Sequence, residues 1–316
     1  MAGCKPLTSD SEGFSLLGCY SFAVATDCGG KVKLTKNLCV KNFPDWRQMD
    51  QQTLDDSYNN HKAIPESAAM FNDWIKRSNV FRSAHSQYLD ISYGSLESEK
   101  IDYYSAGPNT PLVIFIHGGF WQQYSKNNFA FLAENYLKEG ISLAMVDYPL
   151  APQAYMDQIV ASSANAVQFI GQHIAEWGGN PKNVILSGWS AGGHLCVTSM
   201  AKMKVKAVVP ISGIFELEPL IGSFLNKNLH MDLAIAKRNS PILNLPTGTI
   251  PIYLFVGSGE LGEMRRQSYD FANKLKASKY PVELVDIPGK NHFTMLEQFE
   301  RPEGVIHSHI VSIIKQ

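Results

Sequence analysis

The sequence predicts an α/β protein with a mostly parallel sheet that helices cover on both faces. Apolar runs such as residues 112–116 and 252–256 have the pattern of strands buried on both sides. Longer stretches such as residues 153–177 carry apolar side chains at helical spacing and alternate with these runs. Strands that alternate with helices in this way favour parallel pairing through helical crossovers.

The expected elements can be placed in order from residue 46. We expect two helices first, at 52–60 and 65–78, and then an antiparallel sheet edge from strands near 87–93 and 101–104. The parallel strands are expected at 112–116, 141–146, 182–187, 205–210, 252–256 and 282–287. The covering helices are expected at 127–138, 153–177, 265–277 and 305–314.

Two segments stand apart from this alternation. Residues 1–45 show no sustained helical or strand periodicity of apolar residues. We interpret them as an N-terminal extension, partly disordered or draped on the single domain that residues 46–316 form. Residues 213–250 separate two strands by far more than a minimal crossover requires. We interpret this second segment as a small helical cap over a functional site.

Composition narrows the class of protein. The chain has 316 residues and a net charge of −1. A charge so close to zero does not indicate a binding surface for nucleic acid or for an anionic membrane. No apolar stretch reaches the ~18 residues that a membrane span needs. We therefore expect a cytoplasmic protein without a metal or cofactor, and a homodimer is the only protein partnership that we consider.

The cysteines support a reducing compartment. Four of the five cysteines lie within the first 39 residues, and none has the spacing of a zinc site. Free thiols are the plain interpretation, and a disulfide within the N-terminal arm is the alternative. Asp10 and Glu12 argue against a lipidation signal at Cys19, because a signal peptide carries positive charge there.

A G-x-S-x-G motif at residues 188–192 is the first sign of chemistry. An apolar strand precedes it, and small and helix-forming residues follow it. In α/β-hydrolases this strand–turn–helix arrangement projects the serine from the end of a sheet as a nucleophile. We therefore predict an α/β-hydrolase fold with Ser190 as its nucleophile.

A second motif supports this fold. The strand at 112–116 runs into His117, Gly118 and Gly119, an HGG-type loop that supplies oxyanion-hole donors in α/β-hydrolases. The elbow geometry predicts the N–H of Ala191 as one donor, with Gly119 or Gly118 as the other. His117 is expected to brace this loop.

The fold requires an acid and then a histidine after later strands, in that order. His292 follows the last predicted strand and is our candidate for the general base. Glu260 is the preferred acid, and Glu263, Asp286 and Asp147 are alternatives. Such an acid accepts a hydrogen bond from the histidine Nδ1–H and holds the ring in place.

Bulky residues beside these motifs are expected to shape the substrate pocket. They are Phe120, Trp121, Tyr148 and Trp189. For Trp121, a role in core packing explains the bulky side chain as well as contact with the substrate does. His194, one helical turn after the serine, is expected to pack beneath the elbow.

Together these residues resemble the kynurenine formamidase (arylformamidase) branch of the α/β-hydrolases. The resemblance covers roughly residues 46–300 and rests on five segments: 117–121, 188–195, 212–220, 266–268 and 292–293. Two positions depart from that branch. Glu260 stands where its loop carries an aspartate, and Trp189 stands where many members carry histidine.

The resemblance implies hydrolysis of N-formyl-L-kynurenine to L-kynurenine and formate. A related carboxylesterase, aryl-amidase or carbamate hydrolase acting on small aromatic substrates is the alternative, because it would use the same catalytic residues. A hydrolase-fold binding protein without catalysis is the alternative of another class, and the intact set of Ser190, Glu260 and His292 argues against it.

Overall fold

The computed structural model describes residues 25–26, 32–33 and 42–316. The chain divides into two units, Met1–Phe43 and Pro44–Gln316. In the first unit, β1 (Ala25–Thr26) pairs antiparallel with β2 (Val32–Lys33). The interpretation of residues 1–45 as an extension falls mostly on residues outside the described part, and so do the four N-terminal cysteines.

The second unit is built on an eight-stranded sheet in the order β10-β9-β8-β7-β5-β6-β4-β3. Neighbouring strands from β10 to β6 are parallel, whereas β4 and β3 form an antiparallel edge. This topology confirms the predicted fold class and its antiparallel edge. The strands are β3 (Ile91–Ser92), β4 (Lys100–Tyr104), β5 (Thr110–Ile116), β6 (Ser142–Val146), β7 (Gly179–Trp189), β8 (Ala207–Ile211), β9 (Ile252–Gly257) and β10 (Val282–Ile287).

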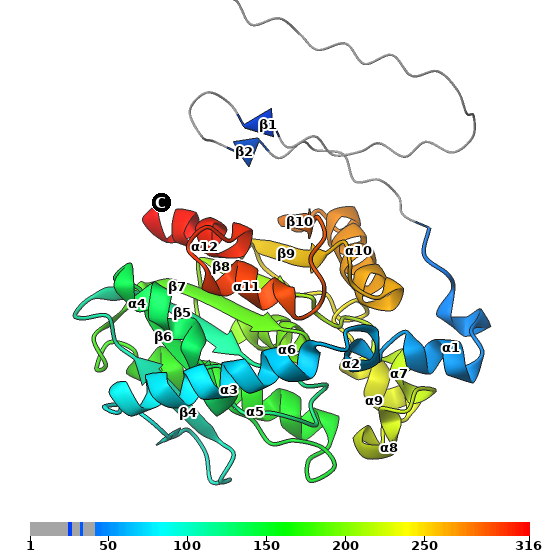
Figure 1. Cartoon of the computed structure of the whole chain (residues 1–316), viewed down its shortest axis with the longest axis horizontal. Helices are drawn as coiled ribbons and strands as arrows, with labels where there is room; N and C mark the ends of the chain where they lie inside the picture. Colours follow the sequence, from blue (N-terminus) through cyan, green and yellow to red (C-terminus); the bar gives the residue numbers. More distant parts are fainter. Residues whose placement is uncertain (1–24, 27–31, 34–41) are drawn as a thin grey trace, which may run out of the picture. The chain divides into compact units, whose positions relative to one another are not determined.

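Helices bury both faces of this sheet (Figure 1). Alternate residues of β5 show the two faces, because Leu112 and Ile114 belong to one apolar core and Val113 and Phe115 to the other. The first core is completed by α5 (Met156–His173), α6 (Ala191–Ser199) and α10 (Gly262–Ala277). The second is completed by α3 (Ser67–Ala84), α4 (Ala133–Lys138), α11 (Thr294–Glu300) and α12 (Val305–Lys315).

Several expected elements differ in the structure. The helix expected at 52–60 is two short helices, α1 (Gln51–Asp56) and α2 (Asn60–Ala63), and the Asn59 side chain caps the second. The strand expected near 87–93 shrinks to β3, because Asp90 adopts a left-handed conformation with φ of 55°. The segment 213–250 is helical as expected, with α7 (Glu218–Ile221), α8 (Asn226–Leu229) and α9 (Leu233–Arg238), and its role as a cap stays a prediction.

The turn between β7 and α6 depends on close backbone contact. A Cβ atom at Gly192 would lie 1.9 Å from the carbonyl oxygen of Ile116, and one at Gly188 would lie 2.2 Å from that of Gly192. Ser190, between these glycines, has φ of 58° and ψ of −120°. A residue other than glycine holds such a conformation only when its surroundings enforce it. The packing of α6 against the end of β5 supplies that constraint.

We predict that Gly192→Ala destabilises the protein strongly. The added methyl group meets backbone on β5 that cannot rotate away, so the free energy of unfolding should fall by ~3 kcal/mol or more. Equilibrium denaturation measures this loss. Gly262→Ala is the matched control, because a Cβ atom there meets nothing within 4 Å. Equal denaturation midpoints for the two variants would contradict this account of the turn.

Candidate active site

A continuous chain of hydrogen bonds joins three buried side chains. Ser190 Oγ lies 3.0 Å from His292 Nε2, and His292 Nδ1 lies 2.8 Å from Glu260 Oε2. Because a carboxylate accepts only, Nδ1 carries the proton and donates it to Glu260, which leaves Nε2 free to accept from the Ser190 hydroxyl. All three residues are buried, at 2%, 3% and 8% exposure for Ser190, His292 and Glu260.

The sheet brings these residues together from distant parts of the sequence. Ser190 lies between β7 and α6, Glu260 lies in the loop after β9, and His292 lies in the loop after β10. These three strands run parallel, so their carboxyl ends share one edge of the sheet. Loops at this edge form the ligand-binding crevice of open α/β sheets.

Two further groups fix the orientation of the Glu260 carboxylate. Its Oε1 atom accepts hydrogen bonds from Ser212 Oγ at 2.6 Å and from the Gly257 N–H at 2.7 Å. Its Oε2 atom is thereby directed at His292. The sequence reasoning missed this role of Ser212, although the position directly after the strand β8 was a usable signal.

The structure brings Glu260 to the histidine and binds Glu263 elsewhere. The carboxylate of Glu263 accepts from Tyr58 Oη at 2.9 Å and from two nitrogens of Arg266, each at 2.8 Å. This ion pair lies on the first turns of α10. Asp286 likewise accepts from Tyr269 Oη, at 2.6 Å.

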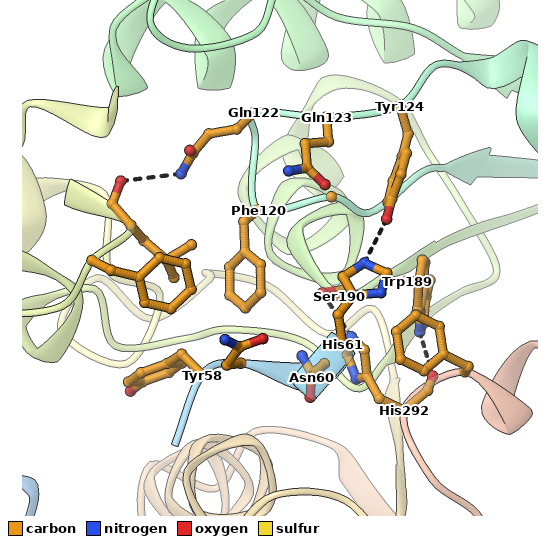
Figure 2. A pocket seen from close by; sticks show the side chains of 15 residues that line it. Tyr58, Asn60, His61, Phe120, Gln122, Gln123, Tyr124, Trp189, Ser190 and His292 are labelled. Atoms are coloured by element: carbon orange, nitrogen blue, oxygen red, sulfur yellow. Dashed lines mark hydrogen bonds between the residues drawn. The ribbon is translucent and has the colours of Figure 1, made fainter. Parts of the chain in front are cut away.

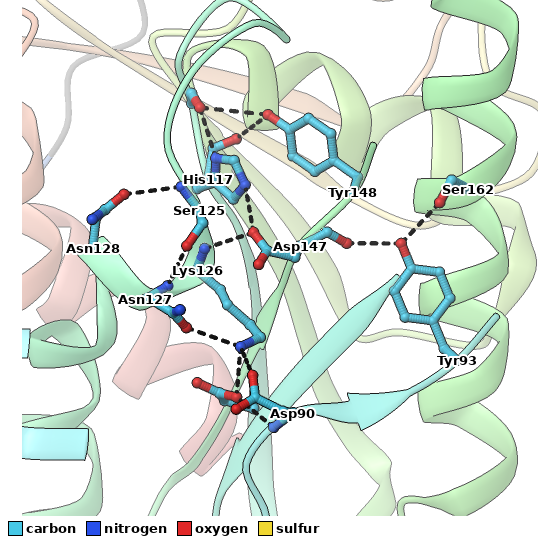
Figure 3. Close-up of polar contacts among 12 residues, drawn as sticks. Asp90, Tyr93, His117, Ser125, Lys126, Asn127, Asn128, Asp147, Tyr148 and Ser162 are labelled. Carbon is cyan, nitrogen blue, oxygen red and sulfur yellow. Dashed lines mark hydrogen bonds and ion pairs between the residues drawn. The ribbon is translucent and has the colours of Figure 1, made fainter. Parts of the chain in front are cut away.

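The glycine loop is held in place by polar contacts behind it (Figure 3). His117 Nδ1 donates to the Gly118 carbonyl at 2.7 Å, and its Nε2 lies 3.1 Å from Asp147 Oδ1. Tyr148 Oη donates to the His117 carbonyl at 2.9 Å. Asp147, one of the alternative acids, therefore contacts the histidine of this loop, and His117 braces the loop as expected.

The glycine loop also approaches the serine closely. A Cβ atom at Gly118 would lie 2.9 Å from Ser190 Cβ, and Gly119, with φ of 108°, lines the pocket in front of the serine. A Cβ atom at Gly119 would lie 2.3 Å from the Gln123 carbonyl oxygen. On the other side of the serine, Ala191 is the first residue of α6, where helical N–H groups have no intrahelical partner.

Ser190 and His292 open into a pocket of about 240 Å³ (Figure 2). Aromatic side chains and uncharged amides together form most of its walls. The other lining residues are Tyr58, Asn59, Asn60, His61, Gly119, Phe120, Gln122, Gln123, Tyr124, Trp189, Phe224, Leu225 and Phe293. The shape and lining suit a small ligand with an aromatic ring.

Two of the four expected pocket residues line this pocket and two do not. Phe120 lines it, as does Trp189, whose Nε1 donates to the His292 carbonyl at 2.9 Å. Trp121 and Tyr148 belong to the apolar core instead. Trp121 packs edge-on against His194 with ring centroids 5.2 Å apart. For Trp121 this is the core-packing alternative that the sequence left open, whereas Tyr148 was expected only in the pocket. Trp121 follows β5 and Tyr148 follows β6, and both side chains are buried in the core.

Sequence reasoning missed the wall that the N-terminal part of the domain contributes. Tyr58 comes from the turn between α1 and α2, and Asn60 and His61 begin α2, more than a hundred residues before Ser190. His61 Nε2 lies 2.7 Å from Tyr124 Oη, which joins this wall to the glycine loop. Burial, with a smaller contribution from the nearby His292, lowers the pKa of His61. No local pattern in the sequence marks this segment as part of a site.

Comparison with known proteins gives the family. The BD-FAE family model matches residues 102–275. A kynurenine formamidase of Danio rerio is 30% identical over 80% of this chain and 93% of its own length. One of Salmo salar is 31% identical over 66% of this chain and 76% of its own length.

The chain belongs to the kynurenine formamidase family. It is a hydrolase of the serine type with the α/β-hydrolase fold, as its sequence motifs predicted. An isoprenylcysteine alpha-carbonyl methylesterase of Arabidopsis thaliana is a more distant relative, 25% identical over 66% of this chain and 57% of its own length.

Solved structures share the fold. A candidate thioesterase from Silicibacter sp. TM1040 superimposes with a TM-score of 0.72 at 26% identity, over 83% of this chain and 99% of that one. Esterase B from Lactobacillus rhamnosis, at 16% identity, has a TM-score of 0.63 over 80% of this chain and 97% of its own, which shows the fold alone. Within the described residues, no helix is both long and apolar enough to cross a membrane.

We predict that the buried His194, beneath the serine turn, lowers the free energy of unfolding as the pH falls from 6.5 to 4. Its Nε2 donates to the Asn239 carbonyl at 2.7 Å, and burial lowers its pKa to about 4. In the unfolded chain His194 therefore takes up a proton near pH 6.5, whereas in the folded chain it takes up that proton only near pH 4. The stabilisation is complete above pH 6.5 and falls by roughly 3 kcal/mol as the pH drops through this window.

Urea denaturation at a series of pH values measures this effect. His194→Gln removes the titrating group and retains a donor for Asn239, so its unfolding free energy should fall less between pH 6.5 and 4 than that of the wild type. Parallel curves for the two proteins would contradict the assignment.

Proposed function

We propose that this protein hydrolyses aryl formamides, and N-formyl-L-kynurenine in particular, with Ser190 as its nucleophile. The hydrogen-bond chain from Ser190 through His292 to Glu260, at the base of an aromatic pocket, carries the proposal. Membership of the kynurenine formamidase family supports the choice of substrate. The products are L-kynurenine and formate.

The first half of the reaction forms a formyl-enzyme. Ser190 Oγ attacks the formyl carbon while His292 Nε2 takes the hydroxyl proton. The resulting imidazolium is stabilised by Glu260, which keeps accepting from Nδ1–H. His292 then gives its proton to the aryl nitrogen, the carbon–nitrogen bond breaks, and the arylamine leaves.

The tetrahedral intermediate requires donors for its oxyanion. We propose the N–H groups of Ala191 and Gly119, which lie on the two sides of Ser190. Gly118 then serves the site by allowing the loop to approach the serine. Loss of one such donor typically costs ~2.7–4 kcal/mol of transition-state stabilisation.

Water completes the second half of the reaction. It attacks the formyl-enzyme with His292 as its base, and formate is released. Trp189 and Phe120 flank the serine and line the pocket, so we propose that they crowd longer acyl groups and favour formyl. The remaining aromatic lining receives the aryl ring.

Hydrolysis of small aryl esters is the second candidate function, because an esterase is among the relatives. The ratio of kcat/KM on N-formylkynurenine and on phenyl butyrate separates the two. We expect the formamide to be preferred, and a higher kcat/KM on the butyryl ester would reverse the assignment.

The cytoplasmic location and the homodimer stay predictions from the sequence.

The nucleophile can be tested by Ser190→Ala. This change removes the attacking oxygen and should lower kcat on N-formylkynurenine by ~10⁶, as in other serine triads. Loss of formyl absorbance follows the reaction. A variant that retains a tenth of the wild-type kcat would refute the role of Ser190.

The choice of acid can be tested by comparing Glu260→Gln with Glu263→Gln. Glu260→Gln should lower kcat by up to ~10⁴, because a neutral amide no longer stabilises the imidazolium. Glu263→Gln weakens a buried ion pair, so it should lower the melting temperature and leave kcat near the wild-type value. The reverse pattern of kcat values would show that Glu263 is the acid.

A further inference from the structure

One buried amide in the pocket has no part in the reaction proposed above. Asn60 lines the pocket and is 5% exposed. Its Nδ2 atom is buried and has no hydrogen-bond partner among the residues that the structure describes. A buried donor without a partner costs free energy, so its presence in a ligand pocket points to a ligand that supplies the acceptor.

The neighbouring polar side chains already have partners. Asn59 Oδ1 accepts from the Lys62 N–H at 3.0 Å. His61 contacts Ser67 through Nδ1 and Tyr124 through Nε2, at 3.0 and 2.7 Å. Asn60 therefore differs from the residues on either side, which serve the local structure.

On the opposite wall, the Gln122 side chain is paired as well. Gln122 Nε2 donates to the Leu225 carbonyl at 3.1 Å, and its Oε1 accepts from Asn228 at 2.9 Å. Figure 2 shows Tyr58, Asn60 and His61 along one side of the pocket, with Gln122, Gln123 and Tyr124 along the other. The unsatisfied amide thus lies on the wall that the N-terminal part of the domain contributes.

The lining also limits the chemistry of the ligand. None of the described residues that line the pocket is Asp, Glu, Lys or Arg. The pKa of His61 is lowered, which favours its neutral form at pH 7. A charged group entering this pocket would find no opposite charge on the described walls, so polar recognition depends on uncharged hydrogen bonds.

We infer that Asn60 is a specificity-determining residue that donates from Nδ2 to an uncharged carbonyl oxygen on the aryl group of the substrate. This inference rests on the proposed function. The formyl oxygen is assigned to the N–H groups of Gly119 and Ala191, so the acceptor for Asn60 belongs to the leaving arylamine. A ketone ortho to the formamide is such an acceptor, and it lies close to the scissile bond.

Two uncharged substrates test the inference. 2-Formamidoacetophenone carries the ortho ketone, and formanilide lacks it. Asn60→Ala and Asn60→Leu remove the donor, and the leucine keeps nearly the volume of the side chain. We expect kcat/KM on the ketone substrate to fall about 10- to 100-fold in both variants, the range for one lost hydrogen bond. The values on formanilide should change by less than about threefold.

Asn72→Ala is the matched control, because Asn72 is an exposed asparagine on α3. It should leave both substrates at wild-type rates, and melting temperatures confirm that all variants are folded. Equal losses on the two substrates would show a structural role for Asn60 and overturn the inference. Unchanged rates on both would overturn it as well.

The same assays separate this inference from the proposed function. If the wild-type enzyme cleaves p-nitrophenyl acetate and neither formamide, the proposed function fails and the inference falls with it. If the wild type cleaves both formamides and loss of Asn60 leaves their ratio unchanged, the inference alone fails.

Discussion

The contact between α6 and the end of β5 is the constraint on which the rest of the site depends. No side chain separates the backbone of Gly192 from the carbonyl of Ile116. This contact holds Ser190 in its strained conformation, with positive φ, at the end of the sheet. It also brings the first N–H groups of α6 next to the glycine loop that follows β5. One steric condition therefore sets the position of the serine and of the surrounding backbone donors.

The second requirement is a fixed carboxylate. Ser212 and the Gly257 N–H hold one oxygen of Glu260, and His292 uses the other. Each group follows or ends a neighbouring parallel strand, so the spacing between strands sets the geometry. These contacts orient the long side chain of Glu260 toward His292. The histidine is then held on the serine without any contribution from the substrate.

Much of this arrangement could be predicted because it is local in sequence. The buried strands, the serine turn and the glycine loop are each read from a few adjacent residues. The order of serine, acid and histidine then follows from the fold. The choice between Glu260 and Glu263 could not be made with certainty from sequence, since they are three residues apart. It depends on Tyr58 and Arg266, which bind the second carboxylate.

The substrate pocket was the least predictable part. Trp121 and Tyr148 lie beside the motifs in sequence, yet the backbone turns them into the core. Asn60 and His61 come from a short helix that the pattern of apolar residues did not resolve. Their place in the pocket is a consequence of tertiary packing, because α2 lies beside the loops that carry Ser190 and His292. Motifs therefore locate the reacting groups, whereas the fold selects the residues that contact the substrate.

The most direct test of the central claim is covalent labelling with a fluorophosphonate, followed by mass spectrometry of the intact protein and its peptides. A serine made reactive by His292 and Glu260 should take up one phosphonate per chain, on the peptide that contains Ser190. Absence of an adduct in folded protein, or an adduct on another residue, would contradict the account.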